Sequence, residues 1–244
     1  VVHHLPDSHI FAVDLRYHGS SGDNGTVNWT VMCRDIKALI EELDLQHLTG
    51  VGHSIGGHII ARTCAWLPQR FRQLVLIDPV IFSPQRYQAF ESRVGDIDPS
   101  VHPVSKRKNR WQSAEEMFQR FESREPFSSW DPTVLKDYCD HALRPNDKNN
   151  TLQLACNPSH EASLYLSQSG NDAIYSELPG IDTATLLLRA RPSDNNLPDL
   201  TTSPTWPELA EVLPNCKDIY LPDMNHFIPM QNPALVAGYI NASR

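Results

Sequence analysis

The sequence has few cysteines, no long apolar run and no excess of basic residues, and each shortage argues against a class of protein. The five cysteines are odd in number and none forms a C-x-x-C pair, so neither a disulfide framework nor a zinc site is indicated. No apolar stretch approaches the length of a membrane span. The net charge of −8 argues against nucleic acid or an anionic membrane surface as partner. A reducing, intracellular compartment fits this composition best.

Alternating apolar runs and helical patterns fill most of the 244 residues. Continuous apolar runs predict buried strands at residues 10–13, 48–51, 74–77, 185–190 and 217–221. Apolar side chains at helical spacing predict helices at residues 28–45, 55–67 and 233–240, and a short helix is expected at residues 207–213. Strands that are apolar on both faces and alternate with helices indicate a mostly parallel sheet between helix layers.

The alternation stops in the middle of the chain. Residues 84–178 show no clear strand pattern, and their aromatic side chains are scattered between prolines and polar turns. We interpret this stretch as a helical lid inserted before the last two strands. The prediction for domain organisation is therefore a core formed by residues 1–83 and 179–244, interrupted by the lid at residues 84–178.

The motif that carries chemistry is Gly52-His53-Ser54-Ile55-Gly56-Gly57. It follows a predicted strand and opens a predicted helix, which is the context in which a G-x-S-x-G serine is exposed as a nucleophile. The start of the helix also presents unpaired N–H groups, so the backbone amide of Ile55 is a candidate oxyanion donor. The alternative interpretation is a structural serine in a tight turn.

A nucleophilic serine needs a base and a carboxylate that orients this base. His226 follows the last predicted strand and Asp194 follows the strand before it, so both are expected at the edge of the sheet that carries Ser54. The order Ser54, Asp194, His226 is the order of α/β-hydrolase-type triads. Asp78 also stands at a strand end and stays open as the alternative acid. Asp14 is expected to fix the loop that follows it.

Four stretches together resemble the α/β-hydrolase superfamily, and they cover most of the chain outside the predicted lid: residues 14–21, 52–57, 74–79 and 225–233. The lid sequence at residues 106–111, 130–135 and 140–145 is similar to that of fungal, often peroxisome-associated hydrolases, some linked to toxin biosynthesis. The resemblance implies an eight-stranded, mostly parallel sheet, a triad of Ser54, Asp194 and His226, and no metal or organic cofactor. With this resemblance, the candidate locations are the cytoplasm and the peroxisome.

One part of the family pattern is missing from the sequence. The resemblance implies a His-Gly-bearing loop after an earlier central strand, and this loop supplies a second oxyanion amide. The chain begins after the place where that loop belongs, and His18-Gly19 lies in a later loop. We therefore expect that the first strands and the oxyanion loop are absent because the chain is truncated.

The sequence thus predicts a serine hydrolase that cleaves an ester or thioester of a small to medium-sized apolar substrate through an acyl-enzyme. Two alternatives stay open. The chain is a catalytically weak or inactive binding protein of the same fold, or it uses the same triad for carbon–carbon bond hydrolysis or acyl transfer. The expected partner is a small apolar ester or thioester.

Overall fold

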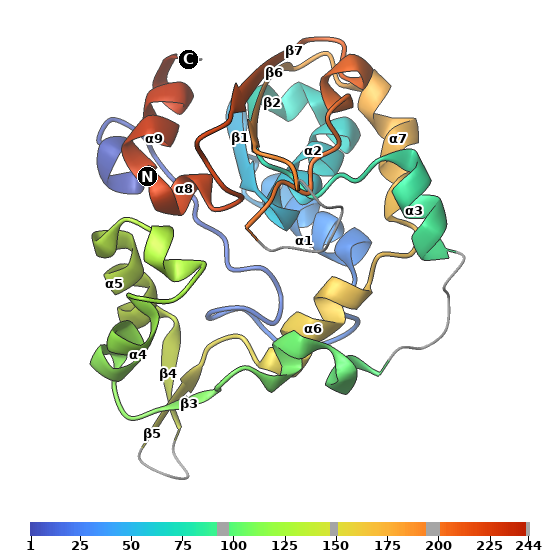
Figure 1. Cartoon of the computed structure of the whole chain (residues 1–244). Coiled ribbons are helices and arrows are strands. Elements are labelled where there is room, and N and C mark those ends of the chain that lie inside the picture. The colour runs from blue at the N-terminus through green and yellow to red at the C-terminus, as the bar shows by residue number, and fades with distance from the viewer. Residues whose placement is uncertain (92–97, 147–150, 194–200, 243–244) are drawn as a thin grey trace. The chain divides into compact units, whose positions relative to one another are not determined.

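The computed structural model describes residues 1–91, 98–146, 151–193 and 201–242 (Figure 1). The chain forms two compact units. The first contains Val1–Ser8, Trp29–Val94 and Ser169–Arg244, and the second contains His9–Asn28 and Gly95–Gln168. The lid assignment for residues 84–178 stays a prediction.

A four-stranded parallel sheet forms the centre of the first unit. Its spatial order is β1 (Leu48–His53), β2 (Phe71–Ile77), β6 (Ala184–Ala190) and β7 (Cys216–Leu221). The carboxyl ends lie in register, since His53 pairs with Ile77 and Ile77 with Leu188. This arrangement confirms the predicted parallel sheet between helices. The resemblance implies eight strands, of which the described residues form four in this sheet.

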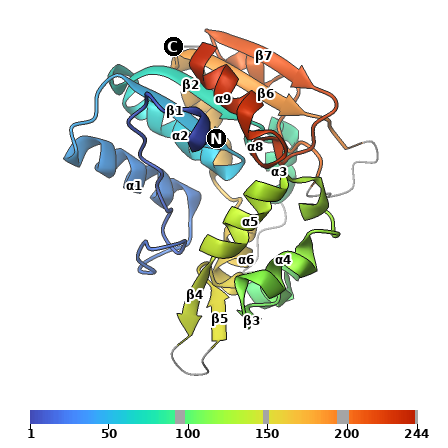
Figure 2. The same cartoon turned by 90° about the vertical axis from the view of Figure 1, so that its left-hand side faces the viewer.

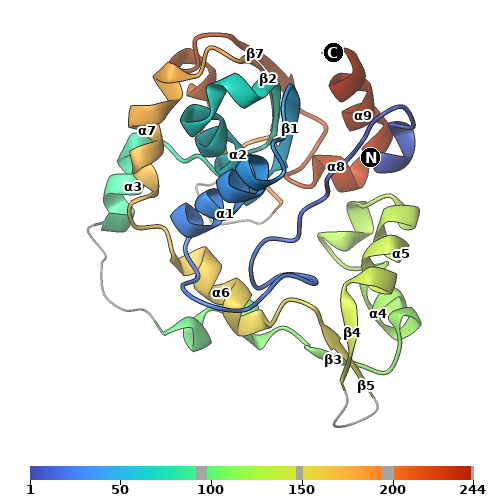
Figure 3. The same cartoon turned by 180° about the vertical axis from the view of Figure 1, so that it is seen from behind.

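Helices cover both faces of this sheet. Figures 1 and 3 show α2 with α1 on one face and α9 on the other. The helices of the unit are α1 (Trp29–Glu42), α2 (Ile55–Trp66), α3 (Pro84–Glu91), α7 (Ile174–Glu177), α8 (Ile228–Gln231) and α9 (Pro233–Ala242). The predicted helix at residues 207–213 is the short 3₁₀ turn Leu209–Val212.

The core lies between the sheet and the layer of α1, α2 and α7. Its fully buried members come from strands, helices and the turns between them: Ala61, Cys64, Leu74, Leu76, Ile81, Ile174, Leu178, Ile181, Leu187 and Leu209. A partly buried ion pair links two of these helices, because Arg62 Nε of α2 donates to Glu177 Oε2 of α7 at 2.7 Å. Packing on this face fixes the start of α2, where the serine of the motif lies.

Among its described residues, the second unit contains a small antiparallel sheet and three helices (Figure 2). The sheet order is β3 (Arg110–Trp111), β5 (Thr151–Leu154), β4 (Leu143–Asn146), and the helices are α4 (Ala114–Phe121), α5 (Pro132–His141) and α6 (Pro158–Leu166). The expectation that residues 84–178 lack strands was therefore wrong. These strands span two to four residues, which is too short for an alternation to be seen.

Residues 10–13 are not the buried strand that their sequence predicts. They have no strand hydrogen bonds in the described structure, and the side chains of Phe11 and Val13 are 46% and 45% exposed. A strand requires a neighbour that accepts and donates backbone hydrogen bonds, and β1 pairs only with β2 among the described residues. The role of Asp14 is confirmed, since its Oδ2 accepts a hydrogen bond from Ser20 N at 2.8 Å.

Short 3₁₀ turns link many of these elements: Val2–His4, Pro68–Arg70, Pro99–Val101, Pro103–Lys106, Phe127–Ser129, Asn171–Ala173 and Leu178–Gly180. Within the described residues, no helix combines the length and the apolar character that crossing a membrane requires.

Candidate active site

Ser54 lies on the sharp turn between β1 and α2, as the motif predicts. Its backbone has φ 57° and ψ −125°, a region that non-glycine residues rarely adopt. The turn is held by the amide of Ser54, which donates to the Ile77 carbonyl at 3.1 Å, and by the Ser54 carbonyl, which accepts from Val80 N at 3.0 Å. A strained strand-to-helix turn of this kind presents a serine hydroxyl above the end of the sheet.

The glycines of the motif let this turn close. A Cβ on Gly52 would lie 2.3 Å from the carbonyl oxygen of Gly56, and a Cβ on Gly57 would lie 2.6 Å from Cβ of Pro79. The first obstacle is backbone, which cannot move aside without opening the turn. Gly56 differs, because a Cβ there meets nothing within 4 Å.

This difference gives a matched pair of variants. Gly52→Ala is expected to lower the free energy of unfolding by about 3 kcal/mol, because the methyl group overlaps backbone atoms. Gly56→Ala is expected to raise it by up to about 1 kcal/mol, because alanine is the better helix former and space is available. Urea unfolding of both variants tests the pair. A Gly52→Ala protein as stable as Gly56→Ala would contradict the close approach.

His226 meets Ser54 through its side chain. The Nε2 atom of His226 lies 2.9 Å from Ser54 Oγ, and its Nδ1 atom lies 2.7 Å from Asp78 Oδ2. An ionised carboxylate only accepts hydrogen bonds, so Nδ1 carries the proton and the lone pair of Nε2 faces the serine hydroxyl. His226 follows β7, and its backbone N donates to the Thr201 carbonyl at 2.8 Å.

Asp78 is fully buried at the end of β2. Besides His226, its carboxylate accepts hydrogen bonds through Oδ1 from Ala190 N at 3.0 Å, from Ser203 Oγ at 2.6 Å and from Thr205 Oγ1 at 3.3 Å. Such a set of donors stabilises a buried carboxylate charge and fixes its orientation. Asp194, the first candidate from the sequence, lies outside the described residues.

The structure adds His53 to the site. Its Nε2–H donates to the backbone oxygen of His226 at 2.7 Å, and the two rings lie 4.9 Å apart. Burial and the neighbouring His226 ring lower the pKa of His53 to about 4, so it is neutral at neutral pH. A neutral donor holds the backbone of His226 without placing a positive charge beside its ring. The side chain of His53 thus contacts His226 from within the motif, a contact that the sequence pattern does not predict.

His58 is a second buried histidine of the same region. Its Nδ1 lies 3.2 Å from the Val80 carbonyl oxygen, its Nε2 has no partner among the described residues, and its ring packs edge-on against Trp29. Burial, with a further contribution from the Arg62 cation, lowers the pKa of His58 to about 3.

The lowered pKa of His58 predicts loss of stability in acid. The unfolded chain, with a pKa of about 6.5, binds the proton before the folded chain does, so stability is constant above that pH and falls as the pH drops toward 3. At pH 5 the loss from this residue is about 2 kcal/mol. His58→Gln keeps a donor for Val80 and should remove this part of the difference between urea unfolding at pH 7 and pH 5. His3→Gln, at an exposed position, serves as control, and an unchanged pH dependence in His58→Gln would contradict the assignment.

Ile55 is the first residue of α2, so its amide has no carbonyl of its own helix to bond. This N–H lies next to the serine in the chain, at a helix start where partial positive charge gathers. Among the described residues, no three histidine, cysteine, aspartate or glutamate side chains lie close enough to hold a metal ion.

Comparison with known proteins gives a family match and several similar proteins. Residues 2–238 match the model of the alpha/beta hydrolase family. A putative esterase/lipase of Haemophilus influenzae is 35% identical over 33% of this chain, and the match spans only 27% of that relative. The abhydrolase domain-containing protein ACTT2 of Alternaria alternata is 24% identical over 80% of this chain and 82% of its own length. Among solved structures, the peroxisomal alpha-beta-hydrolase Lpx1 of Saccharomyces cerevisiae is similar with a TM-score of 0.71, at 20% identity, over 94% of this chain and 64% of that one.

Proposed function

Because this chain belongs to the alpha/beta hydrolase family, we propose that it is a serine hydrolase that cleaves an ester or thioester of a small to medium-sized apolar acyl group. The observation that carries the proposal is the chain of hydrogen bonds from Ser54 Oγ through the His226 ring to Asp78, at 2.9 Å and 2.7 Å. These distances are those at which a base takes a proton from a nucleophile and a carboxylate orients the base. The name of the Haemophilus relative, an esterase/lipase, supports the ester as substrate class.

The reaction proceeds in two halves. Ser54 Oγ attacks the acyl carbonyl carbon while His226 Nε2 takes the hydroxyl proton, and the Ile55 amide donates to the developing oxyanion. The His226 imidazolium then protonates the leaving alcohol or thiol, whose bond to the acyl carbon breaks. Water attacks the acyl-enzyme in the same way and releases the acid. Asp78 stabilises the imidazolium in both halves.

Asp78, the alternative acid of the sequence prediction, takes the orienting role in this proposal. Its support is the contact of Oδ2 with His226 Nδ1 at 2.7 Å, together with the three donors that hold Oδ1. The strand that Asp78 follows, β2, is also the neighbour of β1, which ends just before Ser54. The Asp78 carboxylate and Ser54 therefore lie at the same edge of the sheet, because they follow adjacent parallel strands.

A fluorophosphonate probe and p-nitrophenyl esters of graded chain length test this proposal. We expect covalent labelling of Ser54 and hydrolysis of the short and medium esters, both absent in Ser54→Ala. Intact mass spectrometry shows whether one label is added, and tandem mass spectrometry of a digest identifies the labelled peptide. A folded protein that neither reacts with the probe nor turns over any ester would instead support the inactive binding protein of the same fold, and product analysis with an alcohol acceptor distinguishes hydrolysis from acyl transfer.

The proposal includes an intracellular location, cytoplasmic or peroxisomal. All five cysteines are free, and Cys33, Cys64 and Cys139 are buried. Burial raises the pKa of Cys33 to about 12, so its thiol stays protonated and unreactive. Free thiols fit a reducing compartment. Imaging of a fluorescent fusion, with peroxisomal and cytoplasmic markers, tests this part.

A further inference from the structure

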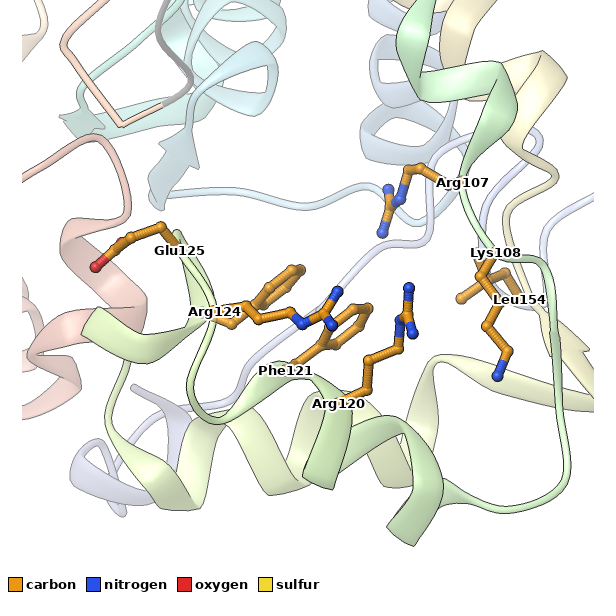
Figure 4. A pocket seen from close by; sticks show the side chains of 8 residues that line it. Arg107, Lys108, Arg120, Phe121, Arg124, Glu125 and Leu154 are labelled. Carbon is orange, nitrogen blue, oxygen red and sulfur yellow. The ribbon is translucent and has the colours of Figure 1, made fainter.

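A pocket with basic walls lies in the second unit and belongs to no part of the triad. Its volume is about 270 Å³. It is lined by four basic residues, three apolar residues and one acidic residue: Arg107, Lys108, Arg120, Arg124, Phe121, Phe127, Leu154 and Glu125. Figure 4 shows the guanidinium groups of Arg107, Arg120 and Arg124 directed into one space, whereas the Glu125 carboxylate points away from them.

Two of the four cations already have partners. Arg107 forms an ion pair with Glu161 at 2.6 Å and Lys108 forms one with Glu116. The side chains of Arg120 and Arg124 form no hydrogen bond or ion pair with any part of the chain that the structure describes. Arg120 and Arg124, both exposed, thus converge without an ion-paired carboxylate, and a bound anion would reduce the repulsion between them.

The remaining walls of the pocket are flat and apolar. The rings of Phe121 and Phe127 stack at 4.1 Å with an interplanar angle of 9°, and Leu154 is buried beside the strand pair. An inorganic ion would leave this apolar surface without a contact. A ligand that joins an anionic group to a planar or apolar group would use both kinds of wall.

The number of guanidinium groups favours a phosphate over a carboxylate. A carboxylate carries one charge and two oxygens, which a single arginine satisfies. A phosphate monoester carries about −1.5 to −2 charges and three terminal oxygens, and so can bond two or three guanidinium forks at once. We propose that this pocket binds a phosphate monoester that carries an aromatic ring, with Arg120 and Arg124 holding the phosphate and Phe121 and Phe127 the ring.

Arg120 also has a competing structural role. It lies in the last turn of α4, where a positive charge stabilises the helix through its dipole. That role requires no ligand. It predicts that substitution of Arg120 lowers thermal stability and leaves ligand binding unaffected.

Isothermal titration calorimetry of the full chain with phenyl phosphate at low ionic strength tests the proposal. We expect saturable binding, at least tenfold weaker binding of inorganic phosphate, and at least tenfold weaker binding of phenyl phosphate by the double variant R120Q/R124Q. Arg110→Gln removes an exposed cation of the same unit outside the pocket and should change the affinity by less than twofold. Arg124→Lys keeps the charge without the planar fork and should give an intermediate affinity.

Several results would overturn the proposal: no saturable binding of phenyl phosphate, equal affinity for inorganic phosphate, or equal losses in Arg110→Gln and R120Q/R124Q. If the double variant does not fold, the single variant Arg124→Gln, altered at an exposed position beyond the end of α4, decides the same question. Calorimetry reports binding alone, so failure here and failure of the proposed hydrolysis are separate results.

Discussion

Asp78→Asn is expected to lower kcat about 10,000-fold, with KM changed only a few-fold. An asparagine has nearly the shape of aspartate, but it lacks the charge that stabilises the His226 imidazolium. Its amide can also present N–H to Nδ1, which would place the imidazole proton on Nε2, facing Ser54. Steady-state hydrolysis of a p-nitrophenyl ester, together with the rate of phosphonate labelling, measures this loss.

A matched control for Asp78→Asn is Ser203→Ala. This variant removes one donor to Oδ1 and leaves the contact between Oδ2 and the His226 ring in place. It should therefore lower kcat far less than Asp78→Asn does. If Asp78→Asn keeps its activity while Asp194→Asn loses it, Asp194 is the acid of the triad and our assignment is wrong.

Ser54→Ala and His226→Ala are each expected to lower kcat about a million-fold, and the double variant should be no slower than either single one. The nucleophile cannot act without the base, and the base has no proton to take without the nucleophile. Active-site titration must accompany the rate measurement, so that a trace of wild-type protein is not counted as residual activity. Losses that multiply in the double variant would mean that the two side chains act independently.

The sequence predicted that Ser54 and His226 lie close together, and the reason is physical. Ser54 and His226 each follow a strand of a parallel sheet, and parallel strands end at one edge, so their side chains converge although 172 positions separate them. The same reasoning does not choose an acid, since Asp78 and Asp194 both follow predicted strands. That choice depends on which carboxylate reaches Nδ1 and on hydroxyl donors such as Ser203, whose place in the fold has no sequence signal.

The structure also differs from the sequence predictions at residues 10–13 and at the strands β4 and β5, for related reasons. Residues 10–13 have strand composition, but composition cannot supply a partner strand. β4 and β5 form in a region of polar residues and prolines because each pairs with its neighbour, and their pattern of apolar residues gives no sign of this. Local sequence predicted helices and buried central strands well, whereas edges and short pairings depended on contacts between distant segments.

The backbone of Ser54 has a last consequence. Its left-handed φ suits glycine better than serine, so Ser54 occupies a position where its own side chain weakens the fold. For the stability of the fold alone, glycine would be the better residue at this position. In the proposed function, the reactivity of Ser54 and the stability of the fold therefore make opposite demands on this position. Variants selected for heat resistance should be checked for loss of the serine.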